Sequence, residues 1–220
     1  MRVKEVLKDA AQGVIYETLI STISGDGSPN IAPIGLIFRD EDLKSFELRI
    51  FKESKTYQNL LDVGEGVVNI TRDPRPFVLG CIPELREKIL KDLEPAKIVK
   101  PLRLRGAEAY IEFVVQDIKV DSSSKVTVIC RPLEAYPGEL RIEPYSRAIY
   151  SLIEAAINAS RARVFMNNSR KLLEILQEID RSRNILRRTA AGTIYEEVLI
   201  DLIKALQKIL QSRPFDRPSP

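Results

Sequence analysis

The chain has 220 residues, of which 44% are hydrophobic and 30% charged, so it can bury a substantial core and is neither disordered nor collagen-like. It contains no histidine, which excludes Ser-His-Asp hydrolysis, HExxH metalloprotease chemistry and imidazole acid–base catalysis. The 34 basic and 31 acidic residues give a net charge of +3, which argues against nucleic-acid binding by overall charge.

The sequence predicts a soluble, cytoplasmic protein without a metal centre. Its two cysteines, Cys81 and Cys130, form no CxxC pair, so they indicate neither a zinc or iron–sulfur site nor a disulfide framework. Both lie in apolar stretches and are expected to be buried. The first ten residues are too polar for a signal peptide, and no apolar run approaches the ~20 residues of a membrane helix.

Up to about residue 142 the pattern predicts mainly strands. The turn at residues 24–28 contains two glycines and joins the first two strands. Consecutive strands with few helices favour a small closed antiparallel barrel over a βαβ sheet. The strands are predicted at residues 14–23, 30–38, 46–51, 66–71, 102–115 and 125–130, and helices at 54–61 and 83–93.

After residue 142 the pattern is helical. Apolar residues recur at three- and four-residue spacing over 145–165, 169–180 and 193–210, which predicts three packed amphipathic helices. The fold class is therefore mainly β plus α. We expect a barrel domain at residues 1–142, a helical domain at 143–212 and a flexible tail at 213–220.

The chain lacks GxGxxG, GxxxxGK[ST] and GxSxG, so no dinucleotide fold, P-loop or nucleophile elbow is indicated. Three polar segments remain as candidates. The first runs from Phe51 to Leu60, where a strand leads into a helix whose first turn holds Ser54, Lys55 and Thr56. Unpaired N–H groups, hydroxyls and ammonium groups together suit a phosphate, whereas Ser54 taken alone would serve as an ordinary helix N-cap.

The other two segments lie on strands. In residues 28–35 (SPNIAPIG), Pro33 has no N–H and Gly35 has no side chain, so a flat ligand can approach the backbone. An irregular edge strand explains this segment as well. In residues 67–71 (VVNIT), Asn69 and Thr71 share one strand face, where Asn69 meets either a heterocycle edge or other protein groups.

In this order the three segments, Ser-Pro-Asn-Ile-Ala-Pro-Ile-Gly, Phe-Lys-x-Ser-x-Thr-Tyr-x-Asn-Leu and Gly-Glu-Gly-Val-Val-Asn-Ile-Thr, resemble those of the FMN-binding split barrel. More narrowly, the chain resembles an uncharacterised, largely archaeal family of flavin-reductase-like proteins with an appended helical domain. The resemblance covers most of residues 10–135 and, more loosely, the helices to about residue 210. It implies an antiparallel Greek-key split β-barrel that forms a homodimer, with FMN near the subunit interface.

The resemblance also implies which residues contact the cofactor. Ser54 and Thr56 would hold the phosphate, with Lys52, Lys55 or Arg49 as the cation. Backbone groups of residues 33–35 would line the isoalloxazine, and Asn69 and Thr71 would lie on the flavin or ribityl side. Arg161, on the first C-terminal helix, would add charge, although a solvated helix face explains it as well. The complete implied set is Pro33, Ile34, Gly35, Phe51, Lys52, Ser54, Lys55, Thr56, Tyr57, Asn59, Asn69, Thr71 and Arg161.

What the resemblance implies for function is an FMN-dependent oxidoreductase that accepts hydride at flavin N5, with NAD(P)H as a transient reductant. Whether the protein catalyses a reaction stays open, because the same barrel would also serve as a non-catalytic carrier or sensor of FMN or of another phosphorylated heterocycle. A nucleic-acid-binding module is a third alternative, since residues 161–188 hold eight basic and three acidic residues. Phe165 is the only aromatic residue in this stretch, so it offers few side chains on which nucleic-acid bases could stack.

Overall fold

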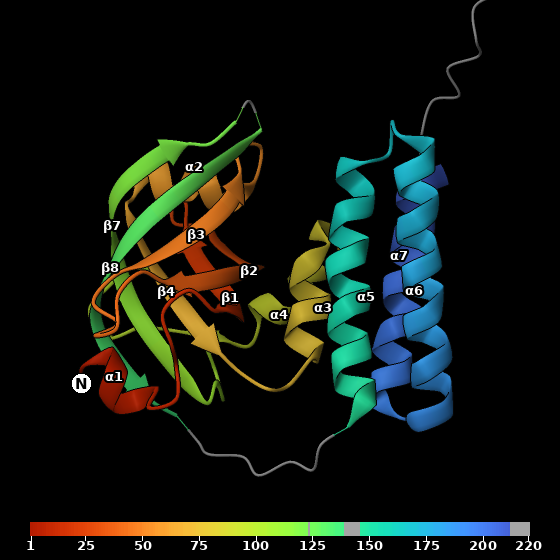
Figure 1. The fold of residues 1–220 in the computed structure, drawn as a ribbon, viewed down its shortest axis with the longest axis horizontal. Coiled ribbons are helices and arrows are strands. Elements are labelled where there is room, and N and C mark those ends of the chain that lie inside the picture. Colours follow the sequence, from red (N-terminus) through yellow and green to blue (C-terminus); the bar gives the residue numbers. More distant parts are fainter. Residues whose placement is uncertain (123, 139–145, 212–220) are drawn as a thin grey trace, which may run out of the picture. The chain divides into compact units, whose positions relative to one another are not determined.

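The computed structural model describes residues 1–122, 124–138 and 146–211 (Figure 1). These residues form two compact units, one made of residues 1–72 and 89–138, and the other of residues 73–88 and 146–211. The predicted tail at 213–220 and the predicted boundary at residue 142 both lie outside the described residues.

Six strands of the first unit form the closed antiparallel barrel that the sequence predicts. Pairing of β4 with β1 closes it, and the order is β1-β2-β3-β8-β7-β4. The spatial order β4-β1-β2-β3 is that of a Greek key. The strands are β1 (Ile15–Ile23), β2 (Pro29–Phe38), β3 (Phe46–Phe51), β4 (Glu65–Ile70), β7 (Ala109–Val120) and β8 (Lys125–Pro137).

Three short helices depart from the sequence prediction. The sequence does not predict α3 (Arg75–Cys81), because seven mostly apolar residues are too few to establish a helical period. The helix predicted at 83–93 is α4 (Pro83–Leu90), which ends three residues earlier. A further short helix, α1 (Val3–Val6), precedes the barrel.

The strand predicted at 102–115 is divided in two. Its first part is β6 (Arg103–Leu104), which pairs with β5 (Leu93–Glu94) in a separate two-stranded sheet. β7 begins only after Gly106, whose φ of +73° turns the chain. The turn at this glycine explains why residues 102–115 do not form one strand.

The barrel core contains a chain of edge-to-face aromatic contacts. Phe46 lies between Phe38 and Phe113, at ring-centroid distances of 6.3 and 5.2 Å, and all three side chains are buried. Gly66 of β4 lies under the Phe113 ring, because an added Cβ would be 2.3 Å from Cζ. Cys130 is buried in the same core, as predicted, and burial raises the pKa of its thiol.

A buried carboxylate holds the segment after β5 on the barrel. Glu112 of β7 is fully buried, and its carboxylate accepts hydrogen bonds from the N–H groups of Lys97, Ile98 and Val99 at 2.8, 2.6 and 2.9 Å. Glu65 of β4 accepts another from residue 100 at 3.0 Å. Four consecutive amides outside any strand or helix thus depend on two barrel side chains.

In the second unit, α5 (Arg147–Val164), α6 (Ser169–Thr189) and α7 (Ile194–Gln211) lie side by side (Figure 1). These are the three predicted C-terminal helices. α6 continues past its expected end at Asp180, because its buried face continues through Leu186. The buried face of α5 is rich in alanine, which allows close helix approach: Ala148, Ala155, Ala156, Ala159 and Ala162. Among the described residues, no helix is long and apolar enough to cross a bilayer.

α3 also belongs to the helical unit, although it precedes β5 in the chain. Its residue Val78 and the following Ile82 are fully buried in one apolar cluster with Leu152 of α5 and Leu202 of α7. The helical unit is therefore assembled from two separate chain segments, whereas the sequence prediction places residues 73–88 within the barrel domain.

Candidate functional site

The side of β2 that faces β3 is only partly paired. β2 pairs with β1 over residues 29–37, whereas β3 pairs with it only at residues 36–38 among those the structure describes. Among the residues that the structure describes, no strand therefore pairs with residues 29–35 on this side. Pro33 suits such an edge because it has no N–H to leave unpaired.

The predicted isoalloxazine contacts, Pro33, Ile34 and Gly35, lie in this stretch and are half-buried. The Ile34 carbonyl accepts a hydrogen bond from the Thr18 hydroxyl at 2.7 Å, which fixes the strand on its β1 side. A Cβ on Gly35 would lie 2.8 Å from Cγ2 of Ile15. Glycine at position 35 therefore leaves this surface of β2 without a side chain next to the exposed Ile15.

α2 (Lys55–Asp62) begins at the turn after β3. Ser54 caps it, because its Oγ accepts a hydrogen bond from the Tyr57 N–H at 3.2 Å. The N-cap interpretation of Ser54 is therefore confirmed. The N–H groups of Lys55 and Thr56 make no hydrogen bond within the part of the chain that the structure describes. Two amide donors and the positive end of the helix dipole are thus available at this turn.

Three ammonium groups belong to the surroundings of this turn. Lys52 and Lys55 are part of it, and the Lys52 N–H donates to Ser124 O at 3.0 Å, which brings the start of β8 alongside. There, Lys125 places Nζ 4.9 Å from the centroid of the Phe51 ring. None of the three lysines forms an ion pair with another described residue. The sequence gives no sign of Lys125, because only the pairing of β3 with β8 brings it here.

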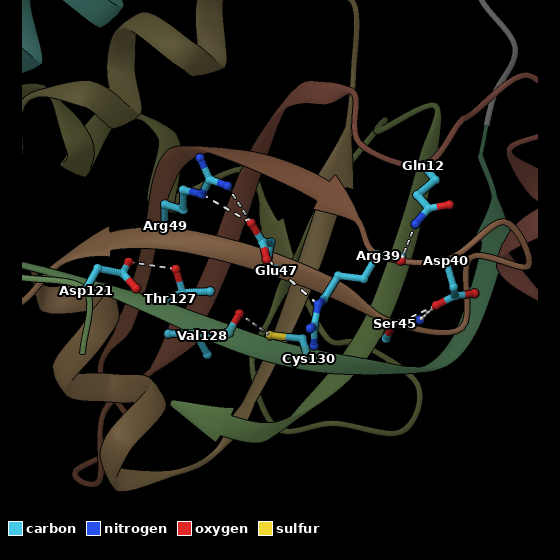
Figure 2. Close-up of polar contacts among 10 residues, drawn as sticks. All are labelled: Gln12, Arg39, Asp40, Ser45, Glu47, Arg49, Asp121, Thr127, Val128 and Cys130. Atoms are coloured by element: carbon cyan, nitrogen blue, oxygen red, sulfur yellow. Dashed lines mark hydrogen bonds and ion pairs between the residues drawn. The ribbon is translucent and has the colours of Figure 1, made fainter. Parts of the chain in front are cut away.

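Arg49, the alternative cation, is held elsewhere. Its guanidinium forms an ion pair with Glu47 at 2.8 Å, and Glu47 also lies 3.8 Å from the Arg39 guanidinium. Figure 2 shows Glu47 between the two arginine side chains. Because a carboxylate already partners Arg49, the three lysines are better placed to meet an anion.

The turn between β1 and β2 brings a carboxylate near the same site. Asp26 accepts a hydrogen bond from the Ser24 hydroxyl and another from the Ser28 N–H, and these bonds lower its pKa to about 2. The positive charge of Lys55 acts on the pKa of Asp26 in the same direction. The hairpin turn therefore lies within electrostatic range of the first residue of α2.

Thr56 and Asn59, both predicted at the cofactor, are buried between α2 and the barrel. Thr56 Oγ1 accepts a hydrogen bond from the Asn30 amide at 3.0 Å, and the Asn59 amide donates to Thr22 Oγ1 at 3.0 Å. Tyr57, from the same motif, packs against the barrel core. Sequence reasoning does not single out Thr22 or Asn30, because only their pairing across β1 and β2 places them together beside α2.

Asn69, predicted on the flavin or ribityl side, is fully buried, and both ends of its amide are bonded to protein. Nδ2 donates to Leu19 O at 3.0 Å and to Ser21 Oγ at 2.8 Å, and Oδ1 accepts from the Leu104 N–H at 2.6 Å. These bonds tie β1, β4 and β6 together, so we leave Asn69 out of the proposed site. Thr71 follows the end of β4 and is half-buried, and its contact with the cofactor stays a prediction.

Arg161 lies on an exposed face of α5 in the helical unit, and its role at the cofactor stays a prediction. Acidic residues are interspersed in the basic stretch that follows it. Arg170 lies 3.5 Å from Glu174, and Arg181 lies 3.0 Å from Glu178. Such pairing makes the charge of this surface mixed, which weakens the case for binding to a nucleic-acid backbone.

A separate cavity of about 380 Å³ lies at the other end of β1, beside the N-terminal segment. It is lined by residues 6–10, residues 16–18, Leu36, Phe38 and Ile70. None of the predicted cofactor-binding residues lines it, so it is distinct from the site at α2.

A family model described as "Protein of unknown function (DUF447) N-terminal domain" matches residues 16–136. Among solved structures, the chain is similar to an FMN-bound DUF447 protein from Methanosarcina mazei, with a TM-score of 0.71 and 22% identity, over 89% of this chain and 96% of that one. It is also similar to 2-nitrobenzoate 2-nitroreductase from Pseudomonas fluorescens, with a TM-score of 0.51 and 22% identity, over 60% of this chain and 70% of that one.

At 22% identity, these structural similarities show the fold alone. They confirm the predicted split barrel with an appended helical region. The family match is the stronger statement, because it spans more than half of the 220 residues. The chain therefore belongs to the DUF447 family.

Proposed function

We propose that the protein binds FMN at the turn between β3 and α2 and along the unpaired edge of β2, and that it works as a flavin-dependent reductase. The observation that carries this proposal is the first turn of α2, where two unpaired N–H groups occur together with three lysines that have no ion-pair partner among the described residues. The FMN bound by the Methanosarcina relative supports the choice of ligand.

The groups at α2 fit the phosphate end of FMN. A phosphate accepts hydrogen bonds and carries negative charge, and the amides of Lys55 and Thr56, the Ser54 hydroxyl and the nearby ammonium groups supply donors and positive charge. Asn59 Oδ1 is buried without a hydrogen-bond partner among the described residues, so it is an acceptor that a ribityl hydroxyl would satisfy.

The unpaired edge of β2 fits the ring. An isoalloxazine is flat and carries donors and acceptors along one edge, which backbone groups of residues 33–35 would meet. Pro33 adds no N–H, and Gly35 adds no side chain that would block the approach. FMN would supply the hydride-accepting chemistry at N5, which amino-acid side chains do not supply. The protein would bind the phosphate, orient the ring and stabilise its charge with backbone N–H groups.

Removal of two hydroxyls tests the phosphate contacts. We expect the purified protein to be yellow, and Ser54→Ala combined with Thr56→Ala to weaken FMN binding roughly 10- to 100-fold, since hydrogen bonds to a charged group are lost. Titration of the apoprotein, followed by flavin absorption and fluorescence, measures the effect. Ser45→Ala combined with Thr189→Ala removes the same two kinds of hydroxyl away from α2 and serves as the control. An unchanged dissociation constant in the first variant would contradict the proposed site.

Turnover separates a reductase from a carrier. We expect NADH or NADPH, added without oxygen, to bleach the flavin absorption of the FMN-loaded protein, and an added electron acceptor to restore it. The absence of a stable dinucleotide motif predicts a reductant that binds transiently, with saturation only at high concentration. If neither nucleotide bleaches the flavin beyond the rate seen with free FMN, the non-catalytic carrier is the better account.

A homodimer with FMN near the subunit interface is part of the proposal. Val14 and Ile15 are 45% and 60% exposed at the start of β1, and Ile15 lies beside Gly35 on the unpaired stretch of β2. Exposed apolar side chains next to a ligand site are typical of surfaces that a second subunit covers.

A further inference from the structure

Four polar side chains form a buried cluster between α2 and the hairpin of β1 and β2. Thr22, Asn30, Thr56 and Asn59 are each at most 2% exposed. The Asn30 amide donates to Thr22 Oγ1 at 3.2 Å and to Thr56 Oγ1 at 3.0 Å, and the Asn59 amide donates to Thr22 Oγ1 at 3.0 Å. Hydrogen bonds that are buried in this way hold side chains in fixed orientations.

These bonds determine how the Thr56 hydroxyl is used. An amide NH₂ group can only donate, so Thr56 Oγ1 is the acceptor toward Asn30, and its one hydrogen is left for a different acceptor. Thr56 makes no other side-chain hydrogen bond within residues 1–122, 124–138 and 146–211. Its hydroxyl is therefore set as a donor in the first turn of α2, where its own N–H and that of Lys55 also have no hydrogen-bond partner in the described part of the chain.

Thr22 holds Asn30 in the orientation that this requires. The two residues are directly opposite each other in the register of β1 and β2. Thr22 Oγ1 accepts one hydrogen bond from the Asn30 amide and another from the Asn59 amide of α2. With one of its two amide hydrogens bound to Thr22, Asn30 presents the other to Thr56.

We propose that Asn30 and Thr22 are positioning residues that set the Thr56 hydroxyl as a donor to the phosphate of FMN, and that they thereby determine the preference for FMN over riboflavin. The inference rests on the proposed function. A phosphate bound by a donor that is already oriented loses less freedom on binding, whereas riboflavin, which has no phosphate, gains nothing from that donor.

The test compares the dissociation constants of FMN and riboflavin, measured by flavin fluorescence on the apoprotein of the full chain. Asn30→Leu keeps the approximate size of the side chain but removes both donors. We expect the affinity for FMN to fall about 10- to 30-fold and that for riboflavin to change less than about twofold. Thr22→Val is expected to shift the same ratio about threefold, and Thr22→Ser, which keeps the hydroxyl, to restore it.

A purely structural role would not move this ratio, because a loosened barrel weakens both flavins equally. Equal losses for both flavins, or unchanged FMN affinity in Asn30→Leu, would overturn the inference. If Asn30→Leu fails to fold, the pair Thr22→Val and Thr22→Ser decides by the same ratio. Asn158→Leu, at a buried asparagine of α5 that donates to Glu154 O at 3.0 Å, is the matched control and is expected to leave both constants unchanged.

The wild-type protein distinguishes the two levels of failure. If it binds neither flavin, the proposed function fails and the inference fails with it. If it binds FMN but the FMN-to-riboflavin ratio does not move in the variants, the proposed function stands and only the inference fails.

Discussion

We expect Gly66→Ala to lower the free energy of unfolding by about 3 kcal/mol, because it forces a methyl group into a filled core. The new Cβ would lie 2.3 Å from Cζ of Phe113 and 2.7 Å from Cε1. The ring cannot easily retreat, since Phe113 is fully buried and lies edge-to-face against Phe46 at 5.2 Å. Urea denaturation followed by circular dichroism measures the change.

Gly25→Ala is the matched control, because a Cβ there meets no atom within 4 Å, and its effect is expected to stay within about 0.5 kcal/mol. Replacing the Phe113 ring with a smaller side chain offers a second check. In Gly66→Ala combined with Phe113→Leu, the two changes are expected to cost at least about 1 kcal/mol less than the sum of the single effects. Strict additivity would show that the ring is not what excludes a side chain at Gly66.

The second large effect is expected for Glu112→Gln, with a loss of about 2 to 3 kcal/mol in the free energy of unfolding. The carboxylate accepts three backbone hydrogen bonds in a fully buried position. An amide of the same shape has one oxygen instead of two, and its NH₂ group would face N–H donors that it cannot accept from. Chemical denaturation of the two proteins measures the difference.

Hydrogen exchange gives this prediction a local readout. The amides of Lys97, Ile98 and Val99 are expected to exchange faster in Glu112→Gln, while amides in β1 and β3 keep rates that follow global stability alone. Glu65 accepts a single N–H at a half-buried position, and the one oxygen of glutamine can still accept it, so the cost of Glu65→Gln is expected to stay below about 1 kcal/mol. A Glu112→Gln protein as stable as the wild type would mean that the segment finds other partners.

Much of the barrel can be predicted from the sequence because its strands carry local signals. The strand predicted at residues 46–51 is found with those bounds, since Phe46, Leu48 and Ile50 are buried and alternate with more exposed residues. The helix predicted at 54–61 spans Lys55–Asp62, because Ser54 is its cap and lies outside it.

Local patterns fail where a segment's partner decides its structure. Residues 102–115 are predicted as one strand, but β6 pairs with β5 instead of continuing into the barrel. The short helix α3 is stabilised by packing against residues far along the chain, such as Leu152. A local stretch of sequence around α3 does not contain these residues, so its pattern cannot predict the helix.

The candidate site divides in the same way. Ser54 and its neighbours are recognisable because the motif is contiguous, whereas Asn30 meets Thr56 only through tertiary packing. One signal in the sequence was nevertheless available. Glu47 and Arg49 are two residues apart on a predicted strand and therefore share a face, which predicts the ion pair that withdraws Arg49 from an anion.

The two-segment origin of the helical unit affects the order in which the chain gains structure during synthesis. α3 emerges from the ribosome before α5 and α7 have been made, so Val78 and Ile82 have no partners for as long as translation of the intervening strands takes. The stretch that matches the family, residues 16–136, carries α3 without those partners. A fragment of residues 16–136 alone would therefore expose the apolar side chains of α3 to water, and exposed apolar surface promotes aggregation.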